Sequence, residues 1–150
     1  MGFDLSGLNP NMTRPEPELP PFAERTSEHW EQYHDWQKEN CGTYFRNNVW
    51  FWRPLWHFVT CVCSNILTEK DIERGSFNEG HRISKTKANK IAKKLYKLIK
   101  DGDVKAYESA YKRHQKSLND KDWDKSYPFS EDNVRRFANF CANSGGFTIC

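Results

Sequence analysis

The stretch from Tyr44 to Trp56 carries the residue types best suited to recognising a planar, charged molecule. Its thirteen residues include three tryptophans, two phenylalanines and one tyrosine, interleaved with two arginines and two asparagines. Aromatic faces stack on planar rings, whereas arginine and asparagine make forked hydrogen bonds to phosphates or base edges. An aromatic wall with a few polar contacts is the usual composition of a small-ligand site. An ordinary core helix with charged neighbours is the alternative interpretation.

The polar residues of this stretch are harder to explain by packing than its tryptophans. Helically spaced aromatic residues usually pack inward, so most of the tryptophans are expected in the core. Arginine and asparagine must instead reach solvent, one another or a ligand, because burying them unpaired is costly. From this stretch we predict ligand contacts by Arg46, Asn47, Asn48, Trp52 and Arg53.

A second candidate site lies where a lysine-rich helix is predicted to begin. The start of a helix exposes free backbone N–H groups and the positive end of the dipole, which together favour an anion. Cationic side chains oppose that dipole, and such local conflicts are enriched at functional sites. A solvated basic face is the alternative. The ligand contacts predicted here are His81, Arg82, Ser84, Lys85 and Lys87.

Neither catalytic nor metal-binding patterns are present in the sequence. It contains no nucleophile elbow, phosphate-binding loop, zinc-protease motif or dinucleotide fingerprint, and its five histidines have no motif partners. Cys61-x-Cys63 lacks the spacing of zinc knuckles and of redox motifs. We therefore predict a non-enzymatic protein without a metal or cofactor.

Charge is distributed unevenly along the chain. The formal net charge is +3, yet residues 1–40 sum to −5 and residues 81–100 carry eight basic residues and no acidic one. This asymmetry indicates either an anionic partner or an acidic arm folded over a basic face.

No apolar run approaches the ~20 residues that span a bilayer. The N-terminus also lacks the basic and then apolar pattern of a secretory signal. We therefore expect no membrane partner and a cytoplasmic location. Oligomeric state is not readable from the sequence, although a homo-oligomer sharing its pocket between subunits would explain the many tryptophans.

The elements that must position these residues are predicted to be mostly α-helical. Five prolines within residues 1–26 favour an extended N-terminal arm, followed by one helical domain over residues 27–150 with five or six helices. No run alternates at period two for long enough to predict a sheet. The predicted helices run from Ser27 to before Gly42, from Phe45 to Ile66 with a kink or a break and fresh helix start at Pro54, from Thr68 to Gly75, from Ser84 to Gly102, from Asp103 onward, and from Ser130 to Gly145-Gly146, before an extended tail over residues 147–150.

Several segments resemble a family of small bacteriophage-encoded proteins. The similarity spans nearly the whole chain, and some relatives carry a cysteine-rich, zinc-ribbon-like insert where only Ser117–Ser126 stands here. The resemblance implies a phage origin and a role inside an infected bacterium, and it transfers no active-site residue. The segments that carry it are Met1-Gly-Phe-Asp-Leu with Gly7-Leu-Asn-Pro10, the Tyr44–Trp56 block, Gly80-His-Arg-Ile-Ser-Lys85, Tyr127-Pro-Phe and Ser144-Gly-Gly-Phe-Thr-Ile-Cys150.

These observations lead to one main functional hypothesis. The two candidate segments would meet around one small nucleotide-type anion, and the protein would sequester a signalling nucleotide of bacterial immunity. Two alternatives remain open. A nucleic-acid-binding role is disfavoured by the moderate net charge and the acidic N-terminal region, and exposed aromatic residues could instead bind a host factor.

Overall fold

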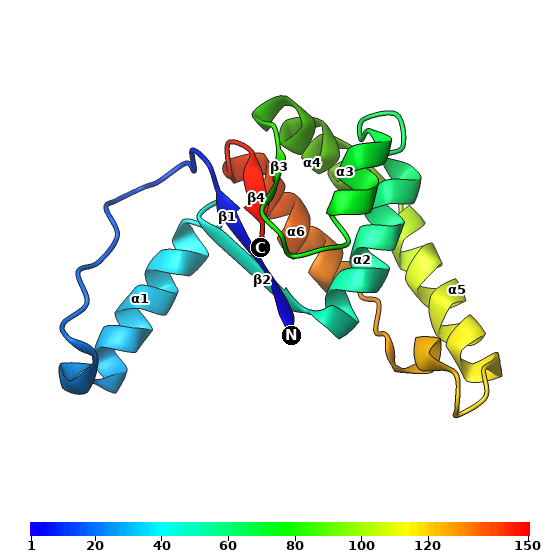
Figure 1. Cartoon of the computed structure of the whole chain (residues 1–150), viewed down its shortest axis with the longest axis horizontal. Helices are drawn as coiled ribbons and strands as arrows, with labels where there is room; N and C mark the ends of the chain where they lie inside the picture. The colour runs from blue at the N-terminus through cyan, green and yellow to red at the C-terminus, as the bar shows by residue number, and fades with distance from the viewer.

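The computed structural model describes residues 1–150 and shows an α+β fold, so the prediction of a mostly α-helical fold is wrong. A four-stranded antiparallel sheet stands beside six α-helices (Figure 1). The elements in chain order are β1 (Gly2–Gly7), η1 (Phe22–Glu24), α1 (Ser27–Glu39), β2 (Tyr44–Asn48), α2 (Val49–Val62), α3 (Glu69–Arg74), β3 (His81–Ile83), α4 (Lys85–Lys100), α5 (Asp103–Ser117), η2 (Trp123–Ser126), α6 (Glu131–Asn143) and β4 (Phe147–Ile149).

The sheet joins the two ends of the chain. Its strand order is β2-β1-β4-β3, so both inner strands come from terminal segments. Residues 2–7 therefore form a strand, and the prediction of an extended Pro-rich arm over residues 1–26 is wrong. The Asp4 amide donates to the Cys150 carbonyl (2.7 Å) and the Cys150 amide to the Asp4 carbonyl (2.8 Å). Short strands paired across more than a hundred residues leave no local periodicity to detect.

Side chains alternate between the two faces of the sheet. Phe3, Leu5 and Phe45 are buried against the helices, whereas Ser6, Tyr44 and Arg46 point to the other face and are exposed. The predicted helix from Phe45 to Ile66 thus begins as a strand, and α2 starts only at Val49 and continues through Pro54. Phe45 and Val49 are four residues apart, a spacing that fits both a strand and a helix. The apolar pattern up to Trp52 therefore did not reveal where β2 ends and α2 begins.

Helix starts follow the predicted capping residues. The side chains of Thr68, Ser84 and Ser130 each accept a hydrogen bond from the backbone amide three residues on, which confirms all three predicted caps. Asp103 is the first residue of α5 rather than its cap, because Gly102 occupies the cap position. The extended tail is also confirmed, since residues 147–149 form β4.

The turn from α6 into β4 requires glycine. Gly145 and Gly146 have φ angles of 66° and 89°, in the left-handed region that other residues rarely adopt. A Cβ at Gly146 would also lie 2.8 Å from the Ile83 carbonyl oxygen. Glycine here lets β4 approach the end of β3 closely enough to pair with it.

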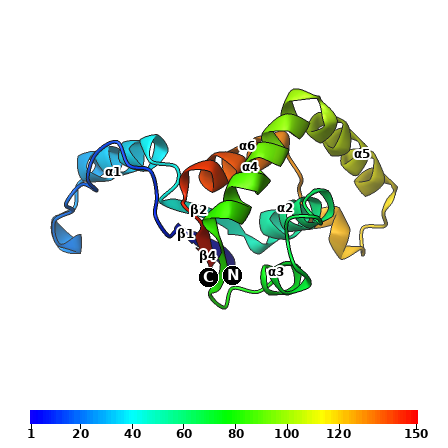
Figure 2. The same cartoon turned by 90° about the horizontal axis from the view of Figure 1, so that it is seen from above.

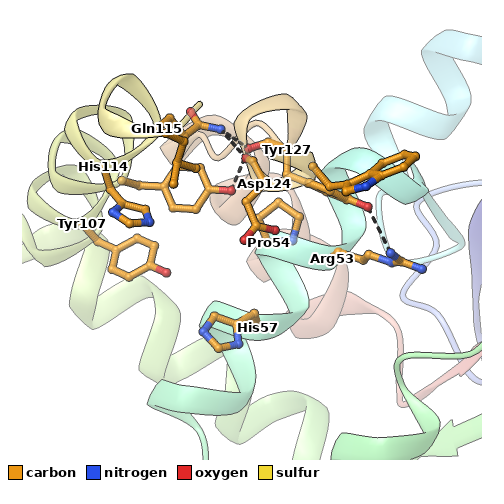
Figure 3. Close-up of a pocket in the computed structure, with 11 residues that line it drawn as sticks. Arg53, Pro54, His57, Tyr107, His114, Gln115, Asp124 and Tyr127 are labelled. Carbon is orange, nitrogen blue, oxygen red and sulfur yellow. Dashed lines mark hydrogen bonds between the residues drawn. The ribbon is translucent and has the colours of Figure 1, made fainter. Parts of the chain in front are cut away.

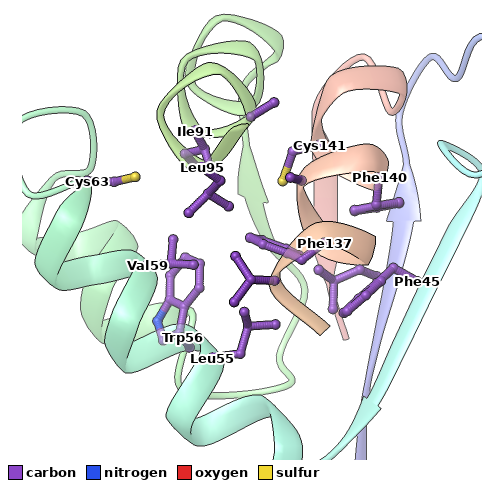
Figure 4. Close-up of a cluster of buried hydrophobic side chains, with 14 of the residues drawn as sticks. Phe45, Leu55, Trp56, Val59, Cys63, Ile91, Leu95, Phe137, Phe140 and Cys141 are labelled. Carbon is purple, nitrogen blue, oxygen red and sulfur yellow. The ribbon is translucent and has the colours of Figure 1, made fainter. Parts of the chain in front are cut away.

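The hydrophobic core lies between the sheet and helices α2, α4 and α6. Leu55 and Val59 of α2 face Leu95 of α4 and Phe137 of α6 (Figure 4), and all four are buried. Phe45 brings the sheet into the same cluster, with its ring centroid 5.5 Å from that of Phe137. Burial of such side chains from four elements is what makes α2 and its neighbours a rigid frame.

Residues 8–39 form a projecting N-terminal lobe. This segment contains α1, and it extends away from the sheet on the side of β2, far from α4, in both views (Figures 1 and 2). The acidic part of the chain is therefore not folded over the lysine-rich face of α4. The buried Trp36 holds α1 to its own leading segment, because its indole N–H donates to the Arg14 carbonyl (3.0 Å). None of the helices is both long and apolar enough to cross a membrane.

Candidate functional site

A cleft lies between α2 and α5 and is closed on its third side by η2 (Figure 3). Its volume is about 700 Å³, within the ~300–1,000 Å³ typical of small-molecule sites. We call it the α2–α5 cleft. It is lined by Arg53, Pro54, His57, Tyr107, Tyr111, His114, Gln115, Leu118, Trp123, Asp124 and Tyr127.

The tyrosines on the α5 wall rest on the core. Tyr107 and Tyr111 lie one turn apart with ring centroids 6.2 Å apart, and Tyr107 packs 4.8 Å from the ring of Phe58. Burial raises the pKa of Tyr111 to about 12, and the nearby Tyr107 and the acidic Asp124 add to it. Both phenols therefore stay neutral near pH 7, presenting uncharged aromatic surface to the cleft.

Tyr127 holds the third wall in place. Its backbone carbonyl accepts hydrogen bonds from the Tyr111 hydroxyl (2.7 Å) and from Gln115 Nε2 (2.6 Å). Its own hydroxyl accepts a hydrogen bond from Arg53 Nη1 (3.0 Å), so one residue links α5 to α2. The ring of Trp50 lies 5.0 Å from its ring centroid. The hydrogen bonds and the ring contact of Tyr127 thus hold the third side of the cleft against α5 and α2.

Polar groups converge on the cleft from facing helices. His57 on α2 and His114 on α5 point toward the same hollow, and Arg53 lies farther along α2 (Figure 3). Apart from its bond to Tyr127, the Arg53 guanidinium has no partner within the chain. Trp123 is 75% exposed at the cleft, so its ring face is free for another planar group. Asp124 is the one carboxylate in the lining.

The structure places only Arg53 of the predicted residues on this cleft. Arg46 lies on β2 with its Nε 3.5 Å from an Asp4 carboxylate oxygen. Asn48 caps α2, because its Oδ1 accepts a hydrogen bond from the Phe51 amide (3.0 Å).

Asn47 and Trp52 are buried and satisfied inside the fold. Asn47 and Asn133 exchange side-chain amide hydrogen bonds of 3.0 and 2.9 Å, which tie β2 to the start of α6. Trp52 donates its indole N–H to the Gly75 carbonyl (2.9 Å) and stacks on Trp56 with centroids 5.3 Å apart. Their polar groups therefore have structural partners, which accounts for amides beside an apolar stripe without a ligand.

Two of the residues predicted near the start of α4, His81 and Lys87, contact a buried carboxylate. Asp71 Oδ1 lies 2.8 Å from His81 Nε2, and its Oδ2 accepts a hydrogen bond from Lys87 Nζ (2.5 Å). Burial by itself raises the pKa of Asp71, but hydrogen bonds from Lys87 and the Thr68 amide outweigh it and hold that pKa well below its usual range. This cluster ties α3 to β3 and α4.

The remaining residues of that segment have simpler roles. Ser84 caps α4 by accepting a hydrogen bond from the Lys87 amide (3.3 Å). Arg82 and Lys85 are exposed and make no ion pair. The segments 44–48 and 81–83 lie on opposite edges of the sheet, and neither of the two main cavities is lined by both. Ligand contact by Arg82 or Lys85 stays a prediction.

Sequence reasoning missed most of the cleft, although two signals were present. Tyr107, Tyr111 and His114 recur at helical spacing on α5, and Trp123 stands alone in a polar segment. Both signals also fit an ordinary helix face and loop. Only the folded chain shows that these residues face Arg53 across one cavity.

Comparisons with protein-family models, with curated proteins and with solved structures find no match to this chain. The structure also contains no group of three or more His, Cys, Asp or Glu side chains that could hold a metal ion. The chemistry of the cleft must therefore be derived from its own lining.

Proposed function

We propose that the chain binds a small nucleotide-type anion in the α2–α5 cleft. The observation that carries the proposal is the coexistence, in one cavity of about 700 Å³, of a free indole face, a partly free guanidinium and two imidazoles. Nucleotides combine a planar base with phosphate, and this lining offers partners for both parts. The proposed site keeps Arg53 from the sequence-based hypothesis and replaces the other contacts.

The aromatic lining accounts for the base. Stacking of a base on an aromatic side chain is worth ~1–3 kcal/mol and tolerates any base, since every base has a π-face. Trp123 is the ring most available for such stacking, because three-quarters of its surface is exposed. The Asp124 carboxylate of η2 and the side-chain oxygen of Gln115 on α5 would accept hydrogen bonds from the amino edge of the base.

The basic groups account for the phosphate. Arg53 bonds Tyr127 through Nη1 only, which leaves other N–H donors of its fork for an oxyanion. His57 and His114 lie on facing helices, so an anion between them can accept a hydrogen bond from an imidazole N–H of either ring. Repulsion from Asp124 favours placing the phosphate on the α2 side of the cleft.

In biological terms, we propose sequestration of a nucleotide signal of bacterial immunity in the cytoplasm of an infected cell. The support for this role is the resemblance of the sequence to bacteriophage-encoded proteins, together with the lack of any catalytic motif. Sequestration needs only tight binding, which a preformed cavity provides without a reaction.

Calorimetric titration with mononucleotides, cyclic dinucleotides and ADP-ribose tests the proposal, with the thermal midpoint measured in parallel. We expect one ligand class to bind and to raise the midpoint, because a ligand that binds only the folded state stabilises it. Arg53→Gln should weaken binding about tenfold, whereas Arg113→Gln, at an exposed arginine outside the cleft lining, should leave it unchanged. The absence of binding across the panel would reject the proposal.

A further inference from the structure

A second cavity lies where the N-terminal lobe meets the sheet. It has a volume of about 320 Å³ and is formed by the segment before η1, the C-terminal half of α1 and the beginning of β2. We call it the lobe cavity. It shares no residue with the α2–α5 cleft. Its lining residues are Glu16, Tyr33, Trp36, Gln37, Thr43 and Tyr44.

Three of these six side chains are aromatic. Tyr33 and Trp36 lie one turn apart on α1, with ring centroids 5.9 Å apart and planes 29° from parallel. Tyr44 adds a ring from β2, and it remains 40% exposed. Aromatic rings carry negative charge on their faces, so rings gathered around one hollow favour a cation.

The phenols in this cavity stay neutral and lie beside carboxylates. Burial raises the pKa of Tyr33, and the negative charge of Glu16 raises it further. Burial raises the pKa of Tyr44 to about 12, with the hydrogen bond from its hydroxyl to Asp4 adding to the effect. Tyr33 and Tyr44 therefore stay protonated near pH 7 and present neutral rings to the cavity.

The Glu16 carboxylate has no cationic partner in the chain. The basic side chains around the lobe are engaged elsewhere: Arg14 pairs with Glu39 (3.1 Å), and Arg46 lies 3.5 Å from Asp4. Arg25 donates through Nε to the Pro20 carbonyl (2.9 Å) and packs over Trp30 at 5.2 Å. The cavity therefore combines three rings with one carboxylate that makes no ion pair, and the nearest influence of opposite sign is the charge of Arg25, which acts on Tyr33.

We propose that the lobe cavity binds a small organic cation of the methylated ammonium class, such as a choline-type headgroup. A divalent metal ion would require several oxygen ligands, and only one carboxylate lines this cavity. A primary ammonium is compact, strongly hydrated and needs three acceptors. A methylated ammonium has few hydrogen bonds to lose, and aromatic faces with one carboxylate are the partners that it prefers.

Calorimetric titration of the full chain with choline tests this inference, with the tryptophan fluorescence of the protein as a second readout. The matched ligand control is 3,3-dimethyl-1-butanol, the neutral carbon analogue of choline, at the same ionic strength. Choline should bind about tenfold more tightly than the neutral analogue, since the cation–π term is lost with the charge. No binding of choline, or equal binding of both compounds, would overturn the proposal.

Two exposed glutamates provide the matched variants. Glu16→Gln should weaken choline binding about tenfold, because it removes the one carboxylate of the cavity without changing its shape. Glu18→Gln changes the same charge two residues away, outside the lining, and should bind choline like the original chain. Tyr44→Leu, which removes a ring at the surface of β2, should weaken binding as well. Unchanged affinity in Glu16→Gln would contradict the inference.

Discussion

The two cavities of this protein are built from similar aromatic surfaces and differ in the charge placed beside them. Tyrosines and a tryptophan line both, but the α2–α5 cleft adds Arg53 and two histidines, whereas the lobe cavity adds Glu16. Aromatic surface supplies contact area for many planar or apolar groups. The adjacent charge then selects the ligand class, an anion in one cavity and a cation in the other.

The cavities also differ in how they are supported. The cleft rests on Tyr107 and Tyr111, which pack against the main core, and on the hydrogen bonds that fix Tyr127. The lobe cavity rests on α1, which projects from the body and buries mainly Trp36 (Figure 2). We therefore expect a preformed cleft and a cavity that a ligand tightens.

Exchanging the charges gives the largest expected effect. Arg53→Glu should weaken nucleotide binding about a hundredfold and leave choline binding unchanged, since it sets a carboxylate against the phosphate. Glu16→Lys should instead weaken choline binding about a hundredfold and leave nucleotide binding unchanged. Calorimetry of both variants with both ligands measures the four affinities. If either substitution weakens the binding of both ligands equally, the two sites are not independent and do not select opposite charges.

Loss of the Asp71 carboxylate tests how much its contacts with His81 and Lys87 stabilise the main body of the fold. Asp71→Asn removes a charge whose side chain is only 6% exposed and leaves Lys87 without its partner, so unfolding should become easier by about 2 to 3 kcal/mol. Asp35→Asn, at an exposed and loose ion pair of 3.8 Å, is the control and should change stability little. Urea titration measures the free energy of unfolding of both variants.

The pH dependence of the free energy of unfolding should also distinguish the original chain from Asp71→Asn. Because the pKa of Asp71 is lower in the folded state than in the unfolded chain, its contribution is complete above the unfolded value of ~3.9. It is lost as pH falls through the lower folded value. The original chain should therefore lose more stability than Asp71→Asn between neutral and acidic pH. Equal losses would show that the carboxylate has no special role.

The smallest effect is expected at Trp123. Trp123→Ala should weaken nucleotide binding about tenfold through lost stacking, and it should not alter the thermal midpoint of the free protein because the ring is 75% exposed. Phe22→Ala removes a ring that is 79% exposed and lines neither cavity, so it should affect neither ligand. A loss of choline binding in Trp123→Ala would remove the distinction between the two sites.

Local features were readable from the sequence where the chemistry is local. Hydroxyl side chains at Thr68, Ser84 and Ser130 begin helices because they bond amides three residues away, and a linear pattern contains that information. The Gly145-Gly146 pair likewise marked the end of α6. Five of the six helices were therefore located near their observed starts.

The sheet and the cleft were not readable because both depend on distant partners. β3 and β4 have three residues each, too few for alternation to stand out, and each is defined only by its neighbour in the sheet. In the cleft, Arg53 meets Tyr127 across seventy-four positions of sequence. The polar side chain of Asn47 suggested a ligand, but its partner proved to be Asn133, another position that no local pattern connects to it.

The pairing of the first strand with the last has a consequence for biosynthesis. Since β1 and β4 lie side by side in the middle of the sheet, residues 2–7 must wait for residues 147–149 before that half of the sheet can close. Helices such as α4 can form early on the nascent chain and β1 can pair with β2, whereas β4 can join β1 and β3 only after residues 147–149 have been synthesised. Until then, the edge of β1 that pairs with β4 is open, and losing those last strand residues would leave β3 with nothing to pair with.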